Sequence, residues 1–315
     1  MAIKYNMEFY THITIPKTPF TFSYTVQTVL LGSCFAENIG KKLEGNKFKT
    51  DLNPFGTLYN PSSIAEAIRM LLQPEQFTGD DLFQHEGIYH SFSHHSRFSS
   101  PSETECLANI NRRLFSSADT ILKAQRMILT FGTAWVYKLK SSGKVVSNCH
   151  RLPEKMFDRQ LLTVGEIVAE WKSLLLSLWK QNPELKILFT VSPIRHWKDG
   201  AHGNQLSKAV LHLAIDRLMS LFDRVSYFPS YEIVMDELRD YRFYAEDMLH
   251  INQQGIDYIW EKFRDLYMGK ETWEMMKKID RLNKCLLHRP LNKDDALDIL
   301  RKQQAMAELK RLGLG

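Results

Sequence analysis

The chain of 315 residues has only four cysteines, at positions 34, 106, 149 and 285, and no Cys-x-x-Cys pair. This spacing excludes a zinc site built from cysteine pairs and predicts free thiols rather than a disulfide framework. No stretch approaches the roughly 18 consecutive apolar residues that a membrane-spanning helix requires. Residues 1–16 lack an apolar core and a small-residue cleavage site. We therefore expect no signal peptide, no membrane partner and a cytoplasmic location.

The composition is typical of a globular protein, with 44% apolar and 24% charged residues. The net charge of +5 comes mainly from lysines and arginines after residue 268. These side chains are interpreted as the solvated faces of helices. Nucleic-acid binding would need basic residues interleaved with aromatic ones, and this tail has few aromatics, so no nucleic-acid partner is expected. The oligomeric state is left open.

Short apolar runs alternate with long amphipathic segments, which predicts βαβ units around a parallel sheet. The expected strands are residues 28–32, 48–56, 126–132, 186–193 and 225–233. The expected helices are residues 34–43, 61–73, 163–182, 203–222 and 252–268. About five strands indicate a flavodoxin-like three-layer α/β/α sandwich. The polar stretches 77–102 and 138–162 break the alternation and are predicted to be excursions.

After residue 268 the pattern is helical only, with amphipathic segments at 271–287 and 292–312. We therefore predict a domain over residues 1–268 and a C-terminal helical extension over residues 269–315. In open α/β sheets, ligands bind beyond the carboxyl ends of the strands. The residues that follow each strand are therefore the candidates for chemistry.

Ser33 follows the first strand, directly after Gly32, where a helix is expected to begin. The unpaired N–H groups and the dipole of a helix start favour negative charge at such a position. Ser33 is therefore a candidate nucleophile, although a serine there can also serve only as a helix cap. Cys34 is a second candidate, because a thiolate is stabilised at a helix N-terminus. The preferred interpretation is that Cys34 is a small buried residue that packs the first helix against the sheet.

A serine nucleophile needs a base, and a histidine base needs an acceptor on its second ring nitrogen. Asp247 and His250 lie three residues apart, just before the last helix of the domain. This spacing lets the carboxylate reach the imidazole, although it also fits two unrelated surface residues. The chain has no Gly-x-Ser-x-Gly sequence, which argues against an α/β-hydrolase.

The sequence Gly-Ser-Cys-Phe-Ala at 32–36 resembles the signature of the GSCFA domain family, which is similar to the SGNH (GDSL-like) hydrolases. Residues 53–61, 147–153, 190–209 and 227–252 also resemble family motifs, in the same order. The resemblance covers roughly residues 15–265. It implies the flavodoxin-like fold and an ester hydrolase site in which Ser33 is the nucleophile, His250 the base and Asp247 the residue that orients it.

The resemblance also implies an oxyanion hole, with backbone donors from Ser33 and Gly56. The asparagine that SGNH enzymes carry after the third strand is missing from Gly132-Thr133-Ala134. Asn148 is the candidate that replaces it. Without a third donor, transition-state stabilisation would be weaker by about 2.7–4 kcal/mol.

Other polar residues near strand ends have two interpretations each. Arg195 and His196 follow the fourth strand and are candidates for substrate binding, or for a structural ion pair. His90, His94 and His95 lack a carboxylate at a matching interval, so we predict a polar loop over the active site rather than a metal site. No metal and no cofactor are expected.

The sequence therefore predicts a serine-dependent hydrolase of acyl or acetyl esters, acting on a small-molecule or carbohydrate ester through an acyl-enzyme on Ser33. Two alternatives remain. An acyltransferase would use the same three residues, and a non-catalytic binding module would keep only the scaffold. The acyl group and the alcohol of the substrate are not predicted.

Overall fold

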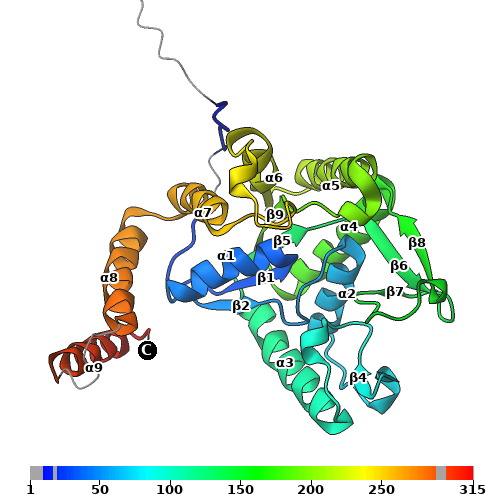
Figure 1. The fold of residues 1–315 in the computed structure, drawn as a ribbon, viewed down its shortest axis with the longest axis horizontal. Coiled ribbons are helices and arrows are strands. Elements are labelled where there is room, and N and C mark those ends of the chain that lie inside the picture. Colours follow the sequence, from blue (N-terminus) through cyan, green and yellow to red (C-terminus); the bar gives the residue numbers. More distant parts are fainter. Residues whose placement is uncertain (1–9, 17–19, 289–295, 315) are drawn as a thin grey trace, which may run out of the picture.

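The computed structural model describes residues 10–16, 20–288 and 296–314. Its centre is a sheet of five parallel strands in the order β10-β9-β5-β1-β2 (Figure 1). The strands are β1 (Thr28–Gly32), β2 (Thr50–Leu52), β5 (Arg126–Phe131), β9 (Lys186–Val191) and β10 (Val225–Tyr227). The predicted flavodoxin-like arrangement of about five parallel strands is therefore confirmed. The signal-peptide prediction rests on residues 1–16, most of which lie outside the described residues. Part of the last predicted helix, residues 292–295, also lies outside them.

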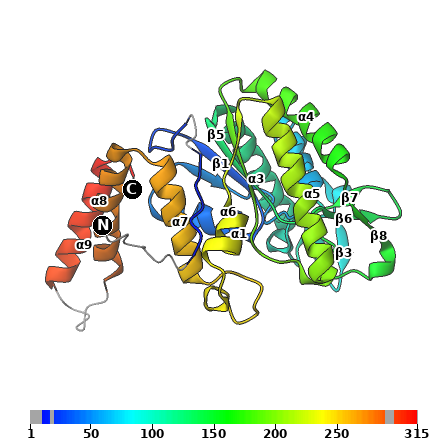
Figure 2. The same cartoon turned by 90° about the horizontal axis from the view of Figure 1, so that it is seen from above.

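Helices cover both faces of the sheet, because alternate residues of each strand point to opposite sides. Leu30 of β1 belongs to a core cluster with α1 (Cys34–Gly45) and α7 (Gln253–Tyr267). Its neighbours Val29 and Leu31 belong to the other cluster. That cluster lies under α2 (Pro61–Leu72), α3 (Glu103–Lys123), α4 (Val164–Gln181) and α5 (Gly200–Leu221). Figure 2 shows α4 and α5 on the opposite side of the sheet from α7.

Both predicted excursions are present as small antiparallel sheets. The first contains the hairpin of β3 (Phe83–His85) and β4 (Ile88–His90), and the second contains β6 (Trp135–Leu139), β7 (Val145–Val146) and β8 (Phe157–Leu161). Helix α3 is not among the predicted helices, and the strand predicted over 225–233 ends at Tyr227. Short helical turns are α6 (Ser230–Glu232), η1 (Gly79–Asp81), η2 (Ser96–Phe98), η3 (Glu154–Met156), η4 (Trp197–Asp199), η5 (Ile233–Glu237) and η6 (Tyr241–Phe243).

The histidines of the first excursion are not part of a polar loop over the site. His90 and His94 are buried, together with His150 from the second excursion. The His94 ring stacks on Phe55, and its Nδ1 is 3.0 Å from the Ser91 hydroxyl. The predicted polar loop is therefore wrong for His90 and His94, because these rings form part of the packing that holds the two excursions together. His95 is only partly buried, and its Nδ1 accepts a bond from the Arg97 amide.

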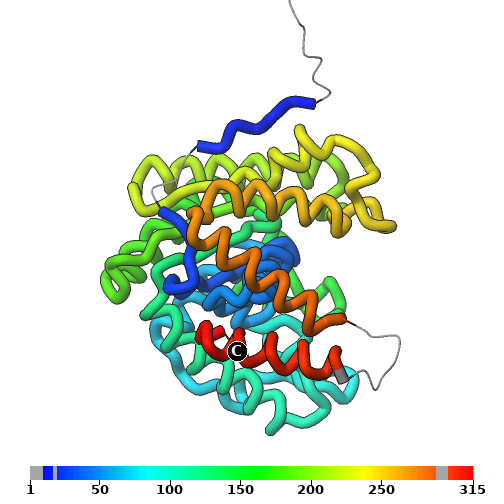
Figure 3. The backbone as a smooth tube through the Cα atoms, turned by 90° about the vertical axis from the view of Figure 1, so that its left-hand side faces the viewer, coloured from blue at the N-terminus to red at the C-terminus, as the bar shows by residue number. Residues whose placement is uncertain are grey.

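The C-terminal helices are α8 (Lys270–Leu287) and α9 (Ala296–Arg311), which pack against each other at one end of the molecule (Figure 3). His288 Nδ1 is 2.8 Å from an oxygen of Asp298, and Lys278 pairs with Glu308. The predicted helical extension is thus present, while the domain boundary at residue 268 stays a prediction. None of the described helices combines the length and the apolar character that a membrane crossing requires.

Candidate active site

Ser33 stands at the junction of β1 and α1. Gly32 before it has φ +146°, a backbone conformation that favours glycine, and Ser33 is the N-cap of α1. The Ser33 Oγ accepts a hydrogen bond of 3.3 Å from the Phe35 amide. Capping uses only a lone pair of the hydroxyl, so its proton remains available to a base. The helix-cap interpretation and the nucleophile interpretation are therefore compatible.

Asp247 and His250 form a pair in the loop before α7. His250 Nδ1 lies 2.5 Å from Asp247 Oδ2, and Asp247 Oδ1 accepts 2.9 Å bonds from the His250 and Leu249 amides. These bonds, from the His250 amide and imidazole and then from Leu249, lower the pKa of Asp247 to about 2. An imidazole that donates from Nδ1 to a carboxylate keeps Nε2 as an acceptor. The contact with Asp247 therefore favours the tautomer that a general base needs.

One pocket of about 240 Å³ brings Ser33 and His250 together. Its lining residues are Ser33, Cys34, Tyr59, Ser192, Ile194, Arg195, His196 and His250. Ser33 is almost fully buried at the floor, whereas the His250 side chain is half exposed. Two segments more than two hundred residues apart thus meet at the carboxyl edge of the sheet, as the topology predicts. Asp247 reaches this group through His250.

Arg195 lines the same pocket and holds the loop of the base. Its guanidinium donates to the Met248 carbonyl and lies 5.2 Å from the ring centres of Trp197 and Tyr244. Met248 has φ +58°, so the turn between Asp247 and His250 is conformationally strained. The structure therefore gives Arg195 a positioning role toward His250, and no ion pair of Arg195 is found among the described residues.

Of the three donors predicted for an oxyanion hole, two are engaged in other bonds and the third lies outside the pocket. The Ser33 amide donates to the Thr130 carbonyl at 3.3 Å, and the Gly56 amide donates to the Asn53 carbonyl at 2.8 Å. The Asn148 side chain accepts from the His150 amide at 2.9 Å. Neither Gly56 nor Asn148 lines the pocket of Ser33. The structure thus does not bring these two residues to the site, and the turn at Asn53 uses the Gly56 amide.

Cys34 packs against the core cluster of α1 and Leu30, as predicted, but it is not fully buried. It is only partly buried, lines the pocket, and has its Sγ 3.4 Å from the Tyr59 hydroxyl. All four cysteines are free thiols, as predicted. Tyr59 is a pocket residue that the sequence analysis did not identify. It lies in the stretch after the second strand, in a motif of the family resemblance, and this position was the available signal.

A polar face of α5 fixes the strand ends beneath the pocket. Asn204 accepts from the His196 amide at 3.0 Å, and the Ser207 hydroxyl accepts from the Ala134 amide at 2.8 Å. The buried Lys208 ammonium donates to the carbonyls of Gly132 and Ser192, at 2.6 Å each. Burial lowers the pKa of Lys208 to about 7. The spacing of 204, 207 and 208 on one helix face was the signal that could have revealed this support.

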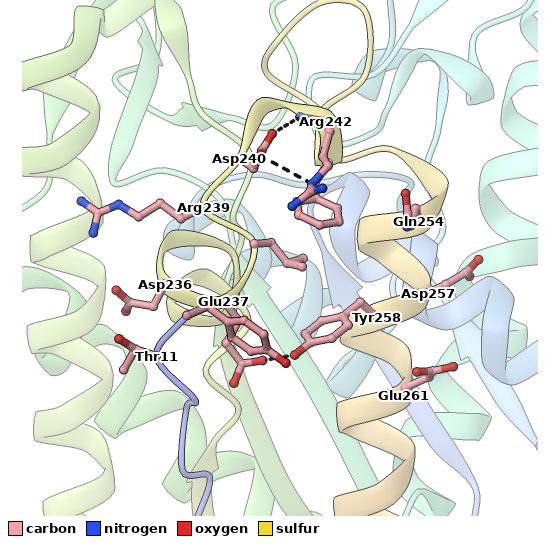
Figure 4. A pocket seen from close by; sticks show the side chains of 13 residues that line it. Thr11, Asp236, Glu237, Arg239, Asp240, Arg242, Gln254, Asp257, Tyr258 and Glu261 are labelled. Atoms are coloured by element: carbon pink, nitrogen blue, oxygen red, sulfur yellow. Dashed lines mark hydrogen bonds and ion pairs between the residues drawn. The ribbon is translucent and has the colours of Figure 1, made fainter. Parts of the chain in front are cut away.

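A larger pocket, of about 780 Å³, lies away from Ser33, between α7 and the segment that precedes it (Figure 4). The buried Glu237 carboxylate accepts from the Tyr258 hydroxyl at 2.5 Å, from Lys262, and from the Ile13 amide at 2.6 Å. Figure 3 shows residues 10–16, in blue, running along this side of the molecule. Glu237 therefore anchors the N-terminal segment. Among the described residues, no cluster of three or more His, Cys, Asp or Glu side chains could hold a metal ion.

The fold and this pocket define a three-layer α/β protein that presents a serine and an aspartate-paired histidine at the carboxyl edge of its sheet. The chain belongs to the GSCFA family, whose model matches residues 27–263. The predicted family is thereby confirmed. No curated protein matches the chain.

Two solved structures show the extent of the similarity. A family 3 carbohydrate esterase from Clostridium thermocellum is 13% identical, over 80% of this chain and 97% of that one, with a TM-score of 0.34. The acetyl xylan esterase Est2A from the rumen bacterium Butyrivibrio proteoclasticus is 12% identical, over 83% of this chain and 67% of that one, with a TM-score of 0.40.

Proposed function

We propose that this protein is a serine-dependent ester hydrolase that forms an acyl-enzyme on Ser33. The observation that supports the proposal most strongly is the pocket that Ser33 shares with His250, whose Nδ1 is bonded to Asp247. These are the nucleophile, the base and the orienting carboxylate of acyl transfer. Family membership is consistent with this role, because the family resembles the SGNH hydrolases.

The reaction follows from the positions of the polar atoms. Ser33 Oγ attacks the ester carbonyl while His250 Nε2 takes its proton. The tetrahedral intermediate then expels the alcohol, which receives that proton from His250, and leaves an acyl ester on Ser33. A water molecule repeats the sequence, with His250 again as the base, and releases the carboxylic acid. Asp247 stabilises the imidazolium that forms in both halves.

The pocket indicates a small acyl group. Its volume of about 240 Å³ is below the range of pockets that enclose drug-sized molecules. Beside it, Trp197 and Tyr241 expose half or more of their surface and flank the Arg195 guanidinium. Exposed aromatic rings next to a cationic hydrogen-bond donor suit an alcohol with both apolar faces and hydroxyls. We therefore infer an acetyl or similarly short ester of a carbohydrate.

Covalent labelling with an aryl phosphonate, read by intact mass and peptide mapping, tests the proposal. We expect a single adduct on Ser33, no adduct on the Ser33→Ala protein, and an adduct on the matched Cys34→Ala protein. Hydrolysis of short-chain aryl esters and acetylated sugars should follow the same pattern. Release of free acid indicates a hydrolase, while acyl transfer to an added alcohol in preference to water indicates the acyltransferase alternative. An unlabelled but folded wild-type protein would refute the enzyme proposal in favour of a binding module.

A further inference from the structure

The site as described has a nucleophile and a base, but no identified donor for the oxyanion of the tetrahedral intermediate. Such donors supply a large part of the catalysis in acyl transfer. The predicted Ser33 and Gly56 amides are engaged in the sheet and in a turn, and Asn148 does not line the pocket. The residues after β5, Gly132-Thr133-Ala134, have no side-chain amide. The Thr133 hydroxyl is bonded to the Ser207 hydroxyl at 3.0 Å. The donor must therefore come from another residue that lines the pocket.

His196 is the residue whose position fits. A methyl group built on Gly132 would lie 3.2 Å from His196 Nε2 and 3.5 Å from Ser33 Cβ. His196 Nε2 and the side chain of Ser33 therefore border the same small space, and the missing Cβ of Gly132 keeps that space open. The residue is held there by two contacts, one through its backbone and one through its ring. The His196 backbone amide donates to Asn204 Oδ1 at 3.0 Å, and the His196 ring meets the Tyr59 ring edge-on, with the centroids 5.7 Å apart.

The protonation state of His196 also suits a donor. Burial, followed by the positive charges of Lys208, His250 and Arg159, lowers the pKa of His196 to about 3. A neutral imidazole carries one N–H, and an imidazole whose pKa is lowered to about 3 is a weak acceptor for the Ser33 proton. His250 is half exposed and bonded to a carboxylate, so the two histidines have opposite environments. Titratable groups with such different surroundings can divide the roles of base and electrophile between them.

We propose that His196 is a catalytic residue that donates its Nε2–H to the acyl oxygen in the tetrahedral intermediate on Ser33. The inference rests on the proposed ester hydrolysis and adds the missing electrophile to it. The imidazole neither gains nor loses a proton in the step. Lys208 supports it indirectly, because its side chain holds the Gly132 and Ser192 carbonyls in place and its charge adds to the burial that lowers the pKa of His196.

The test compares four variants in the full chain, with an aryl acetate as the substrate. His196→Ala removes the donor, and His196→Gln places an amide N–H at a similar distance from the backbone. Gly132→Ala keeps every side chain but puts a methyl group 3.2 Å from Nε2. His212→Ala is the matched control, because His212 is another histidine whose pKa burial lowers, to about 4, and it lies outside the pocket.

We expect His196→Ala to lower kcat about a hundredfold or more, with KM little changed. The decrease of kcat at low pH should occur at the same pH as in the wild type. Phosphonate labelling of Ser33 should slow in parallel, because the phosphoryl oxygen occupies the same position. His196→Gln should recover part of the rate, Gly132→Ala should lose at least tenfold, and His212→Ala should behave as the wild type.

Other outcomes overturn the inference in distinguishable ways. Normal labelling and kcat in His196→Ala would refute the donor role and leave the proposed hydrolase intact. If kcat of His196→Ala no longer decreases at low pH, His196 would be the base instead. A folded wild-type protein without labelling or hydrolysis would remove the proposed function and this inference together.

Discussion

Replacing Gly32 by alanine should destabilise the sheet at the point where it presents Ser33. A Cβ on Gly32 would lie 2.3 Å from the Thr130 carbonyl oxygen, which belongs to the backbone of the neighbouring strand. Gly32 cannot move away easily, since its amide bonds to Asn53 at 2.9 Å and its carbonyl to the Leu58 amide at 3.0 Å. The φ of +146° is itself unfavourable for alanine.

The size of the effect follows from these two contributions. An L-residue held in such a backbone conformation costs about 1–3 kcal/mol, and forcing an extra methyl group into a packed interior costs about 1–3 kcal/mol more. We therefore expect the free energy of unfolding to fall by about 2–6 kcal/mol, out of a total of about 5–15 kcal/mol. The proposed esterase activity of the protein that remains folded should also fall, because any relaxation of the strand end moves Ser33 relative to His250.

Urea denaturation followed by far-UV circular dichroism measures this loss. Gly45→Ala is the matched control, because a Cβ on Gly45 meets nothing within 4 Å and Gly45 lies inside helix α1. Gly45 is the last residue of α1, so that variant should be as stable as the wild type or more stable by about 0.4–1 kcal/mol. Equal stability of the two alanine variants would show that the strand end tolerates the methyl group, and the explanation given for Gly32 would fail.

Three further predictions concern residues outside the reacting group. Burial and His150 lower the pKa of His94 to about 3, so on acidification the unfolded chain binds this proton at a higher pH than the folded protein. Between about pH 7.5 and about pH 5.5, the wild type should therefore lose about 1.4 kcal/mol more of its free energy of unfolding than His94→Phe, as measured by calorimetry. Equal losses in the two proteins would contradict this explanation. Arg195→Met should speed amide hydrogen exchange at residues 245–250 and lower kcat, whereas Arg217→Met on the exposed face of α5 should do neither. Glu237→Gln should expose residues 10–16 to protease without changing the labelling of Ser33, and protection that persists in the variant would argue against Glu237 as the anchor. Burial raises the pKa of Glu237, but the bonds from Tyr258, the Ile13 amide and Lys262 outweigh burial and lower it. The contact between Glu237 and residues 10–16 should therefore weaken as the pH falls.

The sequence predicts the sheet well because each central strand is a short apolar run that ends in turn residues. It predicts the end of β10 badly because the limit at Tyr227 depends on tertiary contacts. The buried Ser230 hydroxyl bonds to the Val191 carbonyl at 2.7 Å and draws the chain into a helical turn after Pro229. Helix α3 could have been predicted, because its buried apolar residues recur every three or four positions. These residues are Cys106, Ile110, Leu114, Ala118 and Ile121.

The candidate site divides in the same way. Ser33, Asp247 and His250 can be placed from the sequence, because a strand end and a short spacing bring them to one edge. Which N–H groups remain free cannot be read from residue types, since a turn at Gly56 or a bond to Thr130 consumes them. The environment of His196 is equally hidden, because it depends on α5 and on the absent side chain of Gly132.

The contrast between a sunken Ser33 and a half-exposed His250 has a consequence for evolution and engineering. The Ser33 hydroxyl lies within the packed sheet and helix α1, so substitutions near it also lower the free energy of unfolding. The imidazole belongs to a peripheral loop tied down by one arginine, and changes there can adjust turnover or alcohol preference while the framework keeps its strength. Variation in substrate use among related chains should therefore concentrate between residues 240 and 250 rather than around position 33.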